Sequence, residues 1–212
     1  MLKKYGRFSS YAKERGWLKY PVPEAGDFFE VYDNSSAGAM TDLSPMYLGP
    51  VIDEFGDVLA CNIEDAWQGS KVFSKQMVGA NWLELWSTSI RFSGKAQRHP
   101  FKSKHPALFS YYRNRRWNYT DARQVMYCRW YSKLVRKTSA YQYLRQRVDA
   151  GVNLVILDPD GESREQAPTK LQRDSREVLE RWINDPKIIF GHGFVLACCL
   201  LDIDVWSELP LE

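Results

Sequence analysis

Glu64, Gln68 and Lys71 are the residues of this chain whose types and spacing first suggest chemistry. They follow one another at steps of four and three within residues 62–71, NIEDAWQGSK. A helix would place all three on one face. A carboxylate, an amide and an amine on one face could serve acid–base chemistry, but the same pattern is common on solvated helix faces. The pattern alone favours the solvated face, so the rest of the chain has to decide.

A second candidate is the segment of residues 98–117, in which basic and aromatic residues are interleaved. Arginine guanidinium groups match phosphate oxygens, and aromatic faces stack on bases. An amphipathic helix with its arginines in solvent is the alternative, and the two interpretations have similar weight. The residues concerned are Phe101, Lys102, Lys104, Tyr111, Tyr112, Arg113, Arg115, Arg116 and Trp117.

Two further patterns concern anions and metals. Gly191, His192 and Gly193 precede an apolar stretch, so they could offer backbone N–H groups to an anion at a helix N-terminus or form a tight packing turn. The other histidines, His99 and His105, lie far from His192 and beside prolines. We therefore expect no metal site. Because no P-loop and no GxGxxG motif occurs, we also expect no cofactor.

Composition limits the class of protein. The 212 residues are 44% hydrophobic, with a net charge of +3 that is too small to require a nucleic-acid partner. The basic N-terminus has no apolar h-region, and no apolar run approaches the roughly 18 residues of a spanning helix. The four cysteines form no CxxC pair. We expect a cytoplasmic protein with buried reduced thiols, without membrane contact and of undetermined oligomeric state.

Strand patterns are few and short. Residues 27–33 and 152–158 each predict a strand, and residues 46–62 predict two short strands around the turn DEFGD. The remaining periodicity is mainly helical. We therefore predict an α+β protein: a mainly helical single domain with a small sheet over residues 26–212, preceded by a basic extension over residues 1–25.

Helix signals position the candidate residues. Asn62 is the expected N-cap of a helix whose apolar positions recur as far as Met77, and Thr120 or Asp121 is expected to cap a long helix over residues 122–138. Gly151 is expected to end the helix that starts at residue 139. Further helices are predicted over residues 80–90, 107–117 and 175–185 and after Gly193. The roles of residues 1–25 and 160–180 stay open.

Taken in order, these segments resemble the NADAR (YbiA-like) N-glycosidase family. LSPMY (43–47) and GPVIDEFGDVLACNIE (49–64) are similar to its N-terminal motifs, and residues 64–71 match its E-x-x-x-Q-x-x-K. A glycine at position 94, WNYTDARQVM (117–126) and FGHGFVLACCLL (190–201) follow in the family order. The chain has Pro45 and Phe190 where the family has asparagine and tryptophan, and it carries roughly 20 extra residues before the last motif.

The resemblance implies the YbiA-like fold and a set of site residues. The catalytic centre would combine Glu64 and Lys71 with one aspartate, for which Asp158, Asp160 and Asp185 are the alternatives. Trp117 would stack on the base or sugar, and Arg116 or Arg123 would hold phosphate. The implied substrate-binding residues are Ser44, Tyr47, Trp67, Gln68, Gly94, Arg116, Trp117, Arg123, His192 and Gly193.

The implied activity is hydrolysis of an N-glycosidic bond between a ribose and a base or amine. The substrate would be ribosylated or ADP-ribosylated, either a metabolite or a nucleotide on nucleic acid, and removal of ADP-ribose from guanine is one such reaction. Two alternatives stay open. The chain could bind ADP-ribose or a nucleotide without catalysis, or it could bind nucleic acid through residues 98–117.

Overall fold

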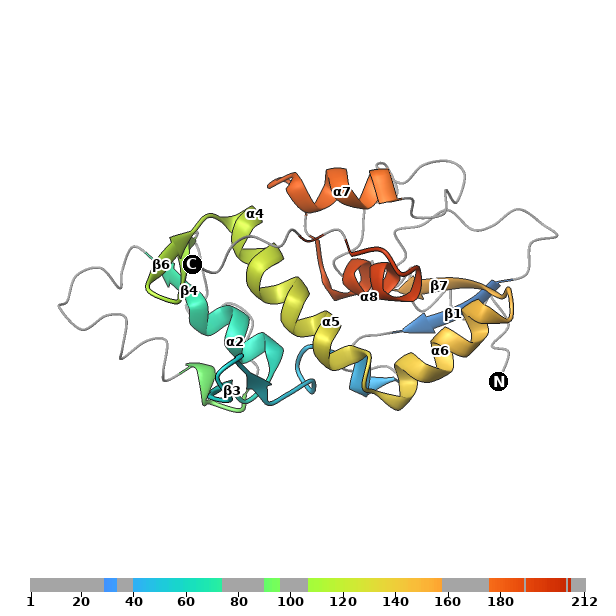
Figure 1. Ribbon diagram of the computed structural model, residues 1–212, viewed down its shortest axis with the longest axis horizontal. Helices are drawn as coiled ribbons and strands as arrows, with labels where there is room; N and C mark the ends of the chain where they lie inside the picture. Colours follow the sequence, from blue (N-terminus) through green and yellow to red (C-terminus); the bar gives the residue numbers. More distant parts are fainter. Residues whose placement is uncertain are drawn as a thin grey trace, which may run out of the picture. The chain divides into compact units, whose positions relative to one another are not determined.

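Short strands and helices follow one another along the chain in the computed structural model (Figure 1). The structure describes residues 29–33, 40–73, 90–95, 107–157, 176–188, 190–204 and 206. In these residues the strands form three small sheets, which confirms the α+β class. Contacts divide the chain into two compact units, and each is described by itself. The first comprises residues 1–44 and 135–205, and the second residues 45–134 and 206–212.

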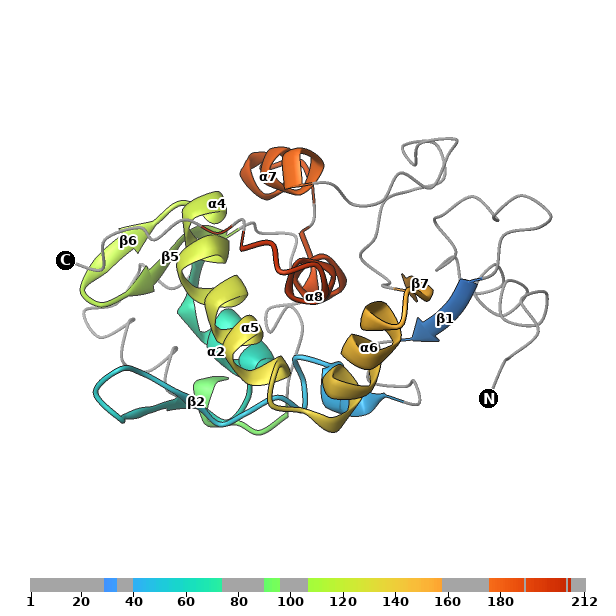
Figure 2. The same cartoon turned by 45° about the vertical axis from the view of Figure 1, so that its right-hand side comes forward.

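A parallel pair of strands forms the sheet of the first unit. β1 (Phe29–Asp33) pairs with β7 (Asn153–Leu157), in a register that runs from Phe29 opposite Asn153 to Asp33 opposite Leu157. The helix α6 (Ser139–Asp149) lies beside the pair in Figures 1 and 2 and contacts β7. Both strands confirm the sequence prediction. Their pairing joins segments that lie far apart in the chain.

The start and end of α6 follow from local sequence. The Thr138 side chain accepts a hydrogen bond from the backbone N–H of Tyr141 and so caps the first turn. Gly151 follows the helix with φ of +77°, a left-handed conformation that costs little without a Cβ. The predicted stop at Gly151 is confirmed. The short 3-10 helix η1 (Thr41–Leu43) contacts α6.

Two more helices complete the described part of the first unit. The amphipathic α7 (Arg176–Asn184) and the apolar α8 (His192–Leu200) meet through aromatic rings. Trp182 lies edge-on to Phe194 with ring centroids 5.2 Å apart, and Phe190 stacks on the same ring at 5.2 Å. Both helices were predicted, but α8 begins at His192, directly after Gly191, and so includes His192 and Gly193, which were expected to precede it.

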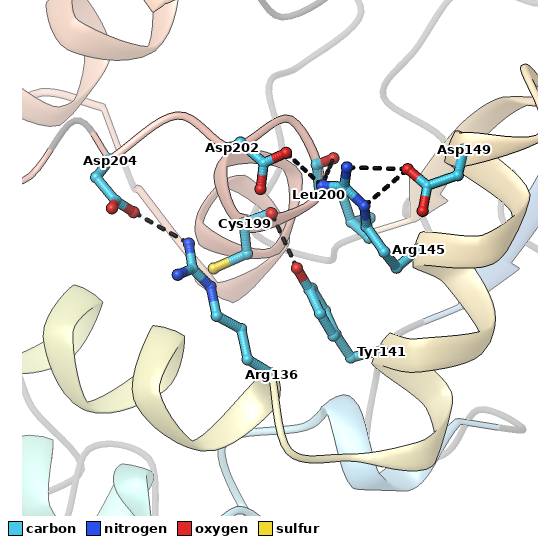
Figure 3. Close-up of polar contacts among 8 residues, drawn as sticks. All are labelled: Arg136, Tyr141, Arg145, Asp149, Cys199, Leu200, Asp202 and Asp204. Atoms are coloured by element: carbon cyan, nitrogen blue, oxygen red, sulfur yellow. Dashed lines mark hydrogen bonds and ion pairs between the residues drawn. The ribbon is translucent and has the colours of Figure 1, made fainter.

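Polar contacts tie α6 to the C-terminal end of α8 (Figure 3). The Tyr141 hydroxyl donates to the carbonyl of Cys199 at 3.0 Å, and Arg145 Nη1 donates to the carbonyl of Leu200 at 3.2 Å. These carbonyls belong to the last turn of α8, where no further helical N–H follows to bind them. The contacts drawn in Figure 3 are called the α6–α8 network below.

Arg145 and Arg136 connect this network to carboxylates. The Arg145 guanidinium lies between Asp149, at 2.9 Å, and Asp202, at 2.6 Å, and these hydrogen bonds raise the pKa of Arg145 (Figure 3). Arg136 pairs with Asp204 at 3.1 Å. All three carboxylates are more than half exposed, so each ion pair by itself stabilises the fold only weakly.

The second unit contains two antiparallel sheets. β2 (Val51–Ile52) and β3 (Val58–Ala60) form the short hairpin predicted around DEFGD, with Gly56 at φ of +91° in its turn. β4 (Lys71–Phe73), β5 (Ala107–Tyr112) and β6 (Arg115–Trp117) form a three-stranded sheet in that order. The core of this unit includes Ile63, Val72, Trp117, Met126 and Tyr131.

The helix α2 (Ile63–Ser70) begins as predicted but ends earlier. The Asn62 side chain accepts from the N–H of Asp65 at 2.7 Å and caps the helix. Periodicity predicted a helix as far as Met77, and this was wrong, because the chain passes directly from α2 into β4 at Lys71 (Figure 1). Pairing of β4 with β5 satisfies backbone groups that a longer helix would otherwise bond internally.

Residues 107–117 form a hairpin and not the predicted helix. β5 and β6 are joined by Arg113 and Asn114 at φ of +52° and +56°, which matches a two-residue turn of type I′ (Figure 2). Aromatic residues suit strands, and β5 gains a partner strand on each side. These pairings outweigh the helical pattern, because they supply hydrogen bonds from chain segments that a local pattern cannot include.

The long helix after the hairpin starts earlier than predicted. Asn118 is the N-cap, since its side chain accepts from the N–H of Asp121 at 2.8 Å, so the expected cap at Thr120 or Asp121 was wrong. The helix comprises α4 (Tyr119–Ala122), the π-helical segment η3 (Arg123–Cys128) and α5 (Arg129–Val135). Segments of π-helix occur frequently at functional sites.

Some predictions fall outside the described residues or are only partly met by them. The helix predicted over residues 80–90 lies almost wholly outside, and residues 98–106 lie outside entirely. None of the helices in the described part of the chain is long and apolar enough to cross a membrane. Three of the cysteines, Cys128, Cys198 and Cys199, are buried as expected, but Cys61 is exposed.

Candidate active site

The N-terminus of α2 is bound by the protein's own groups. Its first three backbone N–H groups donate to the carbonyls of Leu48 and Pro45, at 2.9 and 3.0 Å, and to the side chain of Asn62. These groups would otherwise be free to hold an anion. The segment of residues 45–50 therefore fixes the position of α2, and a ligand has to be recognised by the side chains of the helix.

Glu64, Gln68 and Lys71 form a continuous hydrogen-bonded row. Gln68 Nε2 donates to Glu64 Oε1 at 2.8 Å, and Lys71 Nζ donates to Gln68 Oε1 at 3.1 Å. The amide holds the carboxylate and the amine at its two ends. This set is called the Glu64–Lys71 row below. Although Lys71 lies in β4, one residue beyond the helix, its amine still reaches back to α2.

The row is buried and does not face open solvent. Glu64 and Gln68 are each 4% exposed, and Lys71 is half-buried. Burial makes a charged carboxylate costly unless it is hydrogen-bonded or paired. The expected core positions Ile63, Ala66 and Phe73 are also buried, which confirms the prediction for them. α2 is thus enclosed on its polar face as well as on its apolar face.

Trp67 forms the aromatic side of the row. Lys71 Nζ lies 4.7 Å from the centroid of the Trp67 ring, within the range of a cation–π contact. Tyr127 of η3 and Tyr119 of α4 approach the same indole, with centroids at 5.4 and 6.2 Å. The π-helical segment therefore contributes directly to the surroundings of the lysine.

The structure separates the two arginines that were predicted to hold phosphate. The Arg123 side chain is 1% exposed, and its guanidinium lies 5.1 Å from the ring centroid of Tyr119, which also neighbours Trp67. Arg116 is exposed on β6, with its guanidinium 4.8 Å from the Phe109 ring. Arg123 is therefore the arginine that the described contacts connect to the Glu64–Lys71 row.

The three-stranded sheet brings Lys71 and Trp117 onto one face. Lys71 lies opposite Ser110 on β5, and Ser110 lies opposite Trp117 on β6. Trp117 is buried, donates from Nε1 to the carbonyl of Tyr112 at 3.2 Å, and has the Arg115 guanidinium 4.3 Å from its ring centroid. These contacts account for Trp117 as a packing residue, and stacking on a ligand remains a prediction.

Asp65 is a functional candidate that no motif in the sequence singled out. Its carboxylate is fully buried and accepts from the backbone N–H of Gly94 at 3.0 Å and from Ser93 Oγ at 3.3 Å. Gly94 is exposed, with φ of +64° and open space around its Cα. Asp65 thus attaches the segment of Ser93 and Gly94 to α2, and this contact between distant segments could not be read from the sequence.

The remaining predicted residues lie in different surroundings. Tyr47 is 62% exposed on the segment that caps α2. The first unit contains four of the predicted residues: Ser44, Asp185, His192 and Gly193. Ser44 and His192 are each 2% exposed. Asp185 is half-buried, and its Oδ1 accepts a hydrogen bond from the N–H of Lys187. Asp158 and Asp160 lie outside the described residues. Within the described part, no three His, Cys, Asp or Glu residues are grouped to hold a metal ion.

Comparisons of the chain with family models, curated proteins and solved structures find no match.

Proposed function

We propose that the chain is an N-glycosidase that hydrolyses the bond between a ribose and a base or amine, with Glu64 and Lys71 at its catalytic centre. The observation that carries this proposal is the buried Glu64–Lys71 row, in which Gln68 holds an acid and an amine in fixed orientation. The ordered resemblance to the NADAR family supports the same reaction class and the YbiA-like fold.

The carboxylate of Glu64 suits the charge that develops in this reaction. Cleavage of the glycosidic bond leaves positive charge on the anomeric carbon and its ring oxygen, and a nearby carboxylate stabilises that charge. A buried site strengthens this interaction because it excludes water. The Gln68 amide, which donates to Glu64 at 2.8 Å, orients the carboxylate before a substrate arrives.

Lys71 can act by two routes. As an ammonium group it would donate a proton to the leaving nitrogen, a contribution of about 10²–10⁴-fold in rate. As a neutral amine it would attack the anomeric carbon of the ring-opened substrate and displace the base or amine, which leaves with a proton as the imine to Lys71 forms. Water would then hydrolyse the imine and release the sugar. The indole of Trp67, whose ring centroid lies 4.7 Å from Nζ, covers one side of the amine in either route.

Arg123 is the proposed phosphate-binding residue. Its guanidinium is buried in the same unit, beside Tyr119, whereas Arg116 is exposed on β6. A buried guanidinium binds phosphate oxygens more strongly than an exposed one, since water competes less. The aspartate that the resemblance adds to the centre stays a prediction, with Asp158, Asp160 and Asp185 as its alternatives.

Product analysis by mass spectrometry tests the reaction. The substrates are an oligonucleotide with ADP-ribosylated guanine and an aminopyrimidine ribose phosphate. The unmodified protein should release the free base or amine, and Glu64→Gln and Lys71→Met should each reduce release by about 10²–10⁴-fold. The matched controls are Glu177→Gln and Lys137→Met, because both residues are exposed on the first unit. Full turnover by a Glu64→Gln, Lys71→Met double variant would refute the assignment of the centre.

Borohydride reduction in the presence of substrate separates the two routes. A covalent sugar adduct on the peptide that contains Lys71 would support the imine, and its absence during turnover would favour proton donation. The Lys137→Met variant should give the same adduct as the unmodified protein. Saturable binding of ADP-ribose without any product would instead favour a non-catalytic ADP-ribose binder.

Nucleic-acid binding through the β5–β6 hairpin is a second candidate function. Arg115 and Arg116 are exposed, and Phe109 and Tyr111 are half-exposed beside them. Arg113 is already paired with Glu54, which reduces the positive charge of the hairpin. Salt titration distinguishes the candidates: a steep loss of DNA or RNA affinity with salt supports nucleic-acid binding, and weak salt dependence of ADP-ribose binding supports the glycosidase.

A further inference from the structure

Ser110 occupies the central position of a cross-strand row that contains a proposed catalytic residue. On β5 it lies directly opposite Lys71 of β4 and directly opposite Trp117 of β6. Residues directly opposite one another in antiparallel strands point to the same face of the sheet, with Cβ atoms about 4.5–5.5 Å apart. Ser110 therefore projects from the same face as Lys71, next to the base of its side chain.

This face is turned toward α2. The Lys71 amine on it reaches Gln68 Oε1 at 3.1 Å, and α2 contacts β5. Ser110 thus lies beneath the Glu64–Lys71 row, between a long cationic side chain and a large indole. The serine side chain is shorter than the side chains of Lys71 and Trp117 on either side of it. A group bound next to the Lys71 side chain would therefore meet the Ser110 hydroxyl at the surface of the sheet.

The Ser110 side chain is nearly buried and makes no hydrogen bond to another described residue. The residue is 4% exposed, and its hydroxyl does not belong to the fully buried side-chain atoms without a partner in the described part of the chain. A hydroxyl that water reaches only slightly favours a ligand that can form a hydrogen bond with it. An apolar residue would be the favourable choice at a position with a purely structural role, as Val72 is on the neighbouring strand.

We infer that Ser110 is a further ligand-contacting residue of the proposed site, and that its hydroxyl hydrogen-bonds a hydroxyl group of the ribose held beside Lys71. The inference rests on the proposed function. A ribose hydroxyl fits because it both donates and accepts, as serine does, and because the anomeric carbon must lie within reach of the Lys71 amine. Ser110 contributes to substrate binding and orientation, and Glu64 and Lys71 carry the chemical step.

Steady-state kinetics of Ser110 variants test this inference. Ser110→Ala removes the hydroxyl and keeps the space, so KM should rise by about 3–10-fold with little change in kcat. Ser110→Thr retains the hydroxyl and should recover most of the lost affinity, whereas Ser110→Val fills the space and should raise KM further. The probe is the ribosylated substrate that the unmodified protein turns over, and ADP-ribose serves as the probe for direct binding by calorimetry.

Ser132→Ala is the matched control. Ser132 is also a buried serine of the second unit, but its hydroxyl donates to the carbonyl of Arg129 at 3.1 Å. This control should leave KM unchanged. If Ser110 has only a structural role, Ser110→Ala and Ser132→Ala will alter the melting temperature without altering KM or the ADP-ribose affinity, and the inference fails while the glycosidase proposal stands. Absence of turnover and of ADP-ribose binding by the unmodified protein overturns both.

Discussion

The Glu64–Lys71 row and the α6–α8 network are both sets of hydrogen-bonded polar side chains, but their partners differ. In the α6–α8 network, Tyr141 and Arg145 donate to backbone carbonyls at the end of α8, and the carboxylates are largely exposed (Figure 3). In the Glu64–Lys71 row, the hydrogen bonds join one side chain to the next, and the carboxylate is 4% exposed.

This difference separates a stabilising role from a functional one. Hydrogen bonds to helix-end carbonyls satisfy groups that the fold itself leaves without partners, so they explain why the residues of the α6–α8 network are present. A buried carboxylate bonded to another side chain adds little net stability, because its desolvation offsets the gain. Polar side chains kept under such conditions are candidates for catalysis.

Replacing one carboxylate by an amide in each region should give the largest contrast. Glu64→Gln should lower N-glycosidic turnover by about 10²–10⁴-fold, since the charge that stabilises the cationic transition state is lost. Asp202→Asn in the α6–α8 network should leave turnover per folded molecule within about twofold. Turnover is measured by release of the free base. Equal losses in both variants would remove the functional distinction.

The free energy of unfolding should depend on pH above about pH 9 because of the Cys199 thiol in the α6–α8 network. Burial raises the pKa of the Cys199 thiol to about 11, although the neighbouring Arg136 guanidinium lowers it. Between pH 9 and 11 the unfolded chain releases this proton and the folded chain retains it. Each pH unit should therefore lower the free energy of unfolding by up to about 1.4 kcal/mol.

Urea unfolding of Cys199→Ala at pH 8, 9 and 10 isolates this contribution. The variant should show a shallower loss of stability above pH 9, whatever its stability at pH 8. Identical pH slopes for the variant and the unmodified protein would contradict a buried, protonated thiol. Glu64→Gln should keep the slope of the unmodified protein, because it lies in the second unit.

Gly49→Ala should disturb the support of the Glu64–Lys71 row. A Cβ at this position would lie 2.0 Å from the carbonyl oxygen of Cys61 and 2.8 Å from Asn62 Cα, directly before α2. We expect the free energy of unfolding to fall by about 1–3 kcal/mol and turnover to fall with it, since the start of α2 must move.

Gly56→Ala serves as the comparison for Gly49→Ala. It is strained by φ of +91° but meets nothing within 4 Å in its turn. It should lower stability while leaving turnover per folded molecule unchanged. Chemical denaturation and product assays on both variants decide whether the position of α2, and not stability alone, controls activity. Equal turnover of the two variants would count against that control.

Arg145→Met should have the smallest effect and appear in stability alone. The variant loses the hydrogen bond to the Leu200 carbonyl and both ion pairs, and exposure of the carboxylates limits the loss to about 1–2 kcal/mol. Arg145→Lys keeps the positive charge but lacks the planar guanidinium group. Its free energy of unfolding should therefore lie between those of the unmodified protein and Arg145→Met. A large change in kcat for Arg145→Met would show that the α6–α8 network contributes to activity and not to stability alone.

Much of the local structure could be predicted from the sequence, because capping and turn preferences act over a few residues. Asn62 as the cap of α2, Gly151 as the end of α6 and the strands β1 and β7 follow from such signals. The spacing of Glu64, Gln68 and Lys71 also predicted that they share a face, and their hydrogen bonds agree with it. That this face is buried could not be derived from spacing, because burial depends on what packs against it.

Tertiary contacts decided the features that local patterns do not contain. The amino-acid sequence by itself determined where α2 begins and which residues share its polar face. Pairing between β4 and β5 ended α2 at Ser70, turned residues 107–117 into strands, and placed Ser110 between Lys71 and Trp117. The physical reason is that strand pairing joins hydrogen-bonding groups from distant segments, and their combined energy exceeds the modest preference of a short stretch for helix.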